Sequence, residues 1–149
     1  MKKITPFLWF NNNAEEAIDF YTAVFKNSEK FSVTRAGGNV LTATFKLEDQ
    51  EFIALNGGPH FTFTEAVSFS IDCKSQEEVD HYWEKLSEGG QKSRCGWLKD
   101  PFGLSWQVVP TRLVELLQDK DAAKAQRVMQ AMMQMDKIII SDLEDAAKG

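Results

Sequence analysis

The chain has 149 residues, of which 43% are hydrophobic and 26% charged, and its formal net charge is −5. This length and composition predict one globular domain that buries a core without needing disulfides or metals. The acidic balance and the lack of a Lys/Arg cluster argue against nucleic acid and against anionic membrane surfaces as partners.

No segment has the pattern of a targeting or membrane-spanning sequence. Residues 1–13 contain two lysines, but their apolar run is short, is interrupted by Pro6 and has no small-residue cleavage site. No stretch approaches the roughly 20 apolar residues of a membrane span. The two cysteines, Cys73 and Cys95, lack metal or redox spacing. We therefore expect a protein of the reducing cytoplasm.

The first part of the chain predicts a strand, a helix and three further strands. The strand is expected at residues 4–10, and Asn13 with Glu16 has the spacing of a capping box at a helix start. An apolar stripe at helical spacing follows, formed by Ala17, Phe20, Tyr21 and Val24. Turn signals at Gly37-Gly38 and at residues 48–50 then separate the expected strands, which are residues 30–35, 40–46 and 51–56.

The next part repeats this pattern at an offset of 62 residues, which places Phe7 on Phe69. Ser75 with Glu78 repeats the capping box. A second helical stripe follows, formed by Val79, Tyr82, Trp83 and Leu86. The strands are expected at residues 67–71, near 92–98 and at 104–109, and the sequence from Asp100 to Gly103 has the order of a type I turn. This part therefore has room for fewer strands.

After Pro110 the pattern becomes helical. One stripe at helical spacing contains Ala125, Val128, Met129, Met132 and Met135, and a short helix is expected at residues 141–148. The chain is thus predicted to be α+β, with module one at about residues 1–60, module two at about 61–110 and a helical tail at 111–149. Each module is expected to repeat a strand, a helix and further strands within a single domain.

An ordered set of short segments resembles a known family. The segments are Pro6–Asn11, Ala14–Ala17, Phe20-Tyr21, Leu55–Gly58, Cys95–Asp100 and Phe102–Pro110. Together they resemble the PhnB-like branch, also called the 3-demethylubiquinone-9 3-methyltransferase domain, of the vicinal-oxygen-chelate (glyoxalase/bleomycin resistance) superfamily. The resemblance implies two βαβββ modules whose sheets curl into a mixed-sheet cup with the ligand site inside. It also implies a homodimer.

The resemblance raises the question of a metal, since active members hold a divalent ion with His, Glu or Gln on the first and last strand of each module. Such a site needs several converging donors. Residues 4–10 and 67–71 contain no His and no Glu, and residues 52–56 offer only Asn56. Glu51 and Asp72 lie at strand ends, where we expect them to be solvated. Gln107 falls where the family has its terminal carboxylate. We therefore expect neither a metal nor another cofactor.

Three residues are candidates for catalysis. Cys95 is a thiol on an expected cup strand, His60 lies in the loop joining the modules, and Gln107 could bind a ligand carbonyl. The alternatives are a small buried residue, a loop histidine bound to backbone or water, and a strand amide bound to its neighbour. Whether the protein is an enzyme stays open. Methyl transfer is rejected, because the chain has no Gly-rich turn of the G-x-G-x-x-G type.

The residues expected to bind a ligand are aromatic and polar side chains on the cup strands: Phe7, Trp9, Asn56, Phe69, Cys95, Trp97, Trp106 and Gln107. Core packing is the alternative for each aromatic ring. The expected function is metal-free binding of a small apolar or aromatic molecule in the cup. One alternative is a metal-dependent or metal-free enzyme of lyase, isomerase or dioxygenase type on the same scaffold. The other is a dimeric interaction module with a vestigial site and a Met-rich contact surface.

Overall fold

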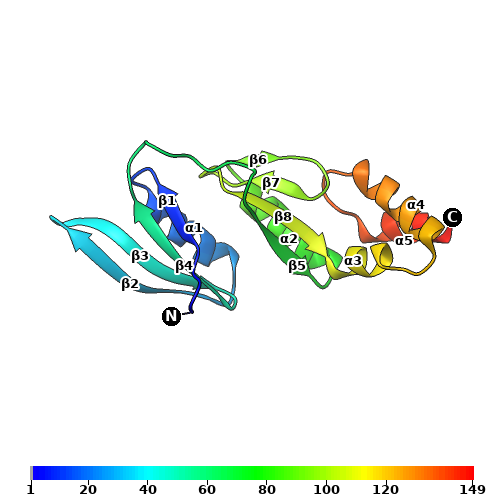
Figure 1. Ribbon diagram of the computed structural model, residues 1–149, viewed down its shortest axis with the longest axis horizontal. Helices are drawn as coiled ribbons and strands as arrows, with labels where there is room; N and C mark the ends of the chain where they lie inside the picture. Colours follow the sequence, from blue (N-terminus) through cyan, green and yellow to red (C-terminus); the bar gives the residue numbers. More distant parts are fainter. Residues whose placement is uncertain (1) are drawn as a thin grey trace. The chain divides into compact units, whose positions relative to one another are not determined.

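A computed structural model describes residues 2–149, which form two compact units with the boundary between Phe63 and Thr64. Each unit contains one βαβββ module with its own four-stranded mixed sheet (Figure 1). Three further helices follow the second module. Within residues 2–149 no helix combines the length and apolar character needed to cross a bilayer. The predicted α+β class and the repeated module are confirmed.

The first unit contains β1 (Phe7–Phe10), α1 (Ala14–Val24), β2 (Ser28–Ala36), β3 (Asn39–Leu47) and β4 (Gln50–Asn56). Its strand order is β1-β4-β3-β2, with β1 parallel to β4 and the other neighbours antiparallel. The helix covers one face of this sheet, where Tyr21 stacks on Phe45 with ring centroids 6.2 Å apart. Leu8 and Phe10 are buried on that face, while Phe7 is 55% exposed on the other. Strand alternation thus separates a core face from an open face.

The start of α1 departs from the sequence prediction. Asn13 occupies the N-cap position, but its side chain makes no capping hydrogen bond. Instead the amide of Ala14 donates to Oδ1 of Asn56, which lies 42 residues away at the end of β4, over 2.9 Å. The capping box expected at Asn13 is therefore wrong, because a strand neighbouring the helix start supplies the acceptor.

The second unit contains β5 (Ser68–Cys73), α2 (Gln76–Ser87), β6 (Gln91–Lys92), β7 (Trp97–Lys99) and β8 (Ser105–Pro110). Its strand order, β5-β8-β7-β6, repeats that of the first sheet, with β5 parallel to β8. Ser75 caps α2 by accepting from the amide of Glu78 over 3.2 Å, so the second capping interaction is confirmed. The turn expected at Asp100 is confirmed by the bond from the Gly103 amide to the Asp100 carbonyl, at 3.0 Å.

The single strand expected near residues 92–98 is wrong. The chain forms two short antiparallel strands there, with Lys92 opposite Leu98. Between them Cys95 and Gly96 take left-handed backbone conformations, with φ of 58° and 83°. An extended strand excludes positive φ, so the chain leaves the sheet at Ser93 and returns at Trp97.

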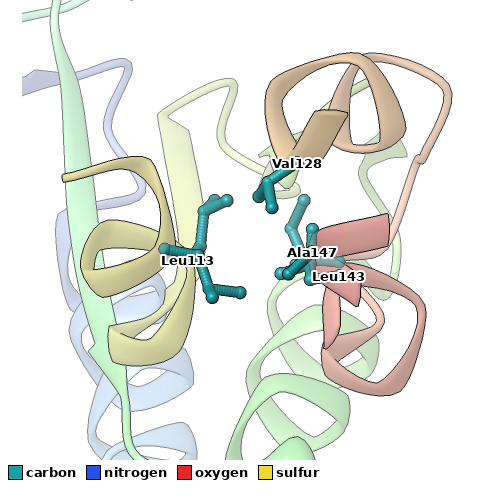
Figure 2. Close-up of a cluster of buried hydrophobic side chains, with 6 residues drawn as sticks. Leu113, Val128, Leu143 and Ala147 are labelled. Carbon is teal, nitrogen blue, oxygen red and sulfur yellow. The ribbon is translucent and has the colours of Figure 1, made fainter. Parts of the chain in front are cut away.

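The tail forms α3 (Thr111–Leu117), α4 (Ala122–Met133) and α5 (Ile140–Lys148). Figure 2 shows Leu113 of α3, Val128 of α4 and Leu143 of α5 pointing toward one another. The other buried members of this cluster are Leu116, Ile138 and Ala147, with Met132 and Met135 packed against them. The predicted helical stripe therefore packs inward, except that Met129 is 37% exposed.

Candidate functional site

The open face of the first sheet carries an apolar patch. Phe7 pairs with Ile53 and Trp9 with Leu55 across β1 and β4, so these four side chains share the face opposite α1. Phe7 is 55% exposed, and the other three are partly buried. Two of the residues expected to bind a ligand, Phe7 and Trp9, are therefore brought together.

The indole of Trp9 is held by the segment that follows β4. Its Nε1 donates to the carbonyl of Gly58 over 2.9 Å, and its ring meets the ring of Phe61 edge-on at 4.9 Å. At Gly57 a Cβ atom would lie 2.3 Å from Cε2 of Trp9, so the indole packs directly against a backbone with no side chain. The position of this ring thus explains Gly57, whereas Gly58 has a φ of 88° and open space around it.

Asn56, another expected ligand-binding residue, uses its amide within the fold. Its Oδ1 accepts from Ala14, and its Nδ2 donates to the carbonyl of Val40 over 3.1 Å. Both ends of the side chain are therefore engaged in joining α1, β3 and β4. We leave Asn56 out of the proposed site.

The second unit has a groove of about 440 Å³ beside β6 and β7. A volume of this size falls within the range of small-molecule sites. The groove is lined by Glu65, Gln91, Ser93, Arg94, Cys95, Trp97, Leu98, Lys99 and Ser105. Two residues expected from the sequence, Cys95 and Trp97, lie here, and both are partly buried.

The polar side of the groove combines an ion pair and a buried hydroxyl. Nζ of Lys99 lies 3.2 Å from Oε2 of Glu65. A bond from its own backbone amide and the ammonium of Lys99 lower the pKa of Glu65, so this carboxyl is ionised at neutral pH. Ser105 is fully buried, and its hydroxyl has no hydrogen-bond partner within residues 2–149. Buried polar groups are normally satisfied, so the free hydrogen-bonding capacity of this hydroxyl at the groove wall is unusual.

Phe69 and Trp106 lie on the opposite face of the second sheet. They are cross-strand partners with ring centroids 5.6 Å apart, and Trp106 is only 3% exposed. Its Nε1 donates to Oδ2 of the buried Asp100 over 2.9 Å. Strand pairing places Lys92, Leu98 and Trp106 side by side on this face. Lys92 forms an ion pair with Glu84 of α2, so this is the face that α2 covers. We leave both rings out of the proposed site.

An extra residue explains why the repeat alignment placed Phe69 with Phe7. In the first module the last buried strand residue, Phe10, lies three positions before the helix N-cap, Asn13. In the second module the equivalent residue, Cys73, lies only two positions before the N-cap, Ser75. The additional residue is accommodated by Asn12, which has a φ of 60°. An offset that aligns the helices therefore aligns strand residues from opposite faces. The sequence signal for this shift is the length of the connection between strand and helix, which has two residues, Asn11 and Asn12, in the first module and one, Lys74, in the second.

The three candidate catalytic residues are divided between the two units. Cys95 lies in the groove of the second unit, and Gln107 on β8 pairs with Trp97 while its Nε2 donates to Oγ of Ser68 over 3.0 Å. His60 is an exposed residue of the first unit. The residues that line the groove, as described within residues 64–149, include no histidine that could act as a base for Cys95.

The residues present do not fit the divalent metal that the superfamily implies. Across residues 2–149 no three His, Cys, Asp or Glu side chains are grouped closely enough to hold an ion. Gln107, at the expected ligand position, is joined to a serine hydroxyl. No chemistry through a metal is therefore derived for this chain.

The fold and the sequence match known proteins. A family model described as 3-demethylubiquinone-9 3-methyltransferase matches residues 2–109. The PhnB protein from Bacillus cereus is 37% identical, with a TM-score of 0.69, and the match covers 74% of this chain and 100% of that one. Among proteins with curated descriptions, none matches this chain.

Two more distant structures share the fold. A Pseudomonas aeruginosa protein is 20% identical, with a TM-score of 0.62, over 74% of this chain and 98% of its own. The fosfomycin resistance protein FosX from Listeria monocytogenes is 16% identical, with a TM-score of 0.53, over 74% of this chain and 93% of its own. The residues matched by the family model end before α3, so the three C-terminal helices lie outside it.

Proposed function

The chain belongs to the PhnB-like, or 3-demethylubiquinone-9 3-methyltransferase, family of the glyoxalase/bleomycin resistance superfamily, and on that premise we propose that it binds a small aromatic molecule. The observation that supports the proposal is the groove of the second unit, which is lined by the partly buried Trp97 and by Ser105, whose buried hydroxyl has no hydrogen-bond partner within residues 2–149. A flat apolar body against the indole and one polar atom at the hydroxyl would match this lining.

The charges in the groove refine the ligand class. Lys99 is paired with Glu65, and both side chains keep substantial exposure, 36% and 63%. An exposed pair of this kind contributes little stability, so a ligand anion can compete for the ammonium at small cost. An aromatic molecule with an acidic or carbonyl oxygen is therefore favoured over a pure hydrocarbon.

The apolar patch of the first unit is a second surface for the same kind of molecule. Phe7 is 55% exposed, and the partly buried Trp9 lies on the same face next to Ile53 and Leu55. Large exposed apolar side chains often mark ligand or protein contacts. We do not extend the family description to methyl transfer, because the chain has no Gly-rich strand-to-helix turn and both sheets are mixed rather than doubly wound.

Titration with two fluorescent aromatic probes tests the proposal. The probes are anionic 8-anilinonaphthalene-1-sulfonate and neutral N-phenyl-1-naphthylamine. Trp97→Leu should weaken both by about tenfold, the loss expected when one aromatic contact disappears. Lys99→Ala should weaken only the anionic probe. Lys92→Ala is the matched control, since it removes an ammonium paired with Glu84 on the other face of the same sheet.

The result that contradicts the proposal is equally specific. Wild-type protein that binds neither probe, or Trp97→Leu protein that binds both as tightly as wild type, would exclude the groove as an aromatic site.

An enzyme on this scaffold is the second candidate, and the position of Cys95 in the groove favours it. Alkylation with iodoacetamide measures the reactivity of this thiol, and repeating it with bound probe shows whether the ligand protects it. Protection supports a thiol that faces the ligand, and equal rates with and without probe contradict it. The homodimer and the cytoplasmic location expected from the sequence stay predictions, the first to be checked by sedimentation velocity.

A further inference from the structure

We propose that residues Met133–Ile140, which we call the strap, belong to the ligand site because they hold the Ser93–Trp97 wall of the groove in its binding conformation. The strap connects α4 to α5 (Figure 1) and lies outside the residues that the family model matches. The inference rests on the proposed function of the groove, which it extends to a positioning element in the C-terminal helices.

The strap replaces sheet pairing that the second module lacks. In the first module the strand after the helix, β2, has 9 residues, whereas its counterpart β6 has 2. The groove wall then leaves the sheet, and the strap accepts its hydrogen bonds. The amide of Cys95 donates to the carbonyl of Met135 over 2.8 Å, and that of Gly96 to the carbonyl of Asp136 over 2.7 Å.

Side chains of the wall add to this attachment. Nη2 of Arg94 donates to the carbonyl of Met133 over 3.0 Å, and its Nε lies 3.3 Å from Oδ1 of Asp136. At Gly96 a Cβ would lie 3.3 Å from Cγ1 of the fully buried Ile138, so wall and strap are in close contact. Three consecutive wall residues are therefore bound to one short segment.

The wall needs such restraint. Cys95 has a φ of 58°, a left-handed conformation that residues with a Cβ rarely adopt and that surrounding contacts must maintain. Cys95 and Trp97 both line the groove. If the strap loosens, the wall can relax toward ordinary backbone angles and carry these two side chains away from their positions.

The strap is fixed in turn to α2. Nε2 of Gln76 donates to the carbonyl of Ile138 over 3.0 Å, and its Oε1 accepts from the amide of Ile140 over 2.8 Å. Lys137 adds an ion pair with Asp80 at 2.9 Å. Gln76 itself is outside the groove lining. A substitution there therefore reaches the groove through the strap.

Gln76→Ala in the full chain tests the inference, with Arg127→Ala as the matched control. Like Gln76, Arg127 makes two side-chain bonds to the backbone of the C-terminal segment, donating to the carbonyls of Ala146 at 3.0 Å and Ala147 at 2.8 Å, but it does not hold the strap. Losing two such bonds should speed amide exchange at Cys95 and Gly96 by about tenfold in Gln76→Ala protein. Arg127→Ala should leave those two amides at the wild-type rate.

Probe binding completes the test. Because only the ordered wall binds, 8-anilinonaphthalene-1-sulfonate at about ten times its Kd should slow exchange at Cys95 and Gly96 by roughly tenfold, in wild-type and Gln76→Ala protein alike. Exchange at Cys95 and Gly96 that is equal in the two variants overturns the inference. So does exchange at these two amides that bound probe leaves unchanged. Failure of the proposed function is distinct from both, since it appears in the wild-type protein as no binding at all.

Discussion

Asn56→Ala should destabilise the first unit far more than Asn13→Ala, although only Asn13 has the sequence signature of a helix cap. The Asn56 amide joins three elements, accepting from Ala14 at the start of α1 and donating to Val40 on β3 over 2.9 and 3.1 Å. Asn13 makes no side-chain capping bond, and its buried Oδ1 has no hydrogen-bond partner within residues 2–149.

The size of the difference follows from these contacts. Each net hydrogen bond contributes about 1 kcal/mol, and an unsatisfied buried partner adds a desolvation cost. Ala14 is fully buried and Val40 is 9% exposed, so water cannot readily replace the lost amide at either partner. We expect Asn56→Ala to lower the free energy of unfolding by about 2 to 3 kcal/mol. For Asn13→Ala we expect a change of less than about 0.5 kcal/mol, since no cap bond is lost.

Urea unfolding followed by far-ultraviolet circular dichroism measures both changes, and native-state exchange of the first α1 amides assigns them to this helix. Exchange there should accelerate in Asn56→Ala protein and stay near wild type in Asn13→Ala protein. If Asn13→Ala proves the more destabilising substitution, the helix is capped locally and the reasoning from the β4 contact is refuted.

Three further predictions concern buried groups. Burial, with two nearby carboxylates, raises the pKa of Cys73 from about 9 to about 12. Between pH 9 and 12 the thiol therefore loses its proton in the unfolded chain but keeps it in the folded protein. The free energy of unfolding of the wild type should fall by about 4 kcal/mol over this range. Cys73→Ala should lack that loss in urea titrations, and parallel pH profiles would contradict the assignment. Gly57→Ala places a Cβ 2.3 Å from the Trp9 ring and should cost about 1 to 3 kcal/mol, with a shifted indole N–H resonance; an unchanged resonance would argue against this packing. Asp100→Ala leaves three donors without their acceptor, including the Trp106 indole. It should lower the free energy of unfolding by about 3 kcal/mol and shift tryptophan emission to the red. A urea midpoint equal to that of wild type would contradict this prediction.

Features carried by neighbouring residues could be predicted from the sequence. The apolar stripes of α1 and α2, the Ser75 cap and the turn beginning at Asp100 depend on residues within about four positions of one another. Two residues expected at the site are accessible in the structure, since Trp97 lines the groove and Phe7 is exposed, while their role in ligand binding stays a prediction.

Tertiary structure alone decided which face each ring occupies and what holds the groove. One left-handed residue, Asn12, shifts the first strand by one position against the repeat, so Phe69 faces the core while Phe7 faces solvent. The acceptor for α1 comes from Asn56, 42 residues along the chain, and the Cys95 wall is held by carbonyls about 40 residues further on. Local periodicity reports spacing within one element, whereas these features depend on pairings between distant segments that exist only once the chain has folded.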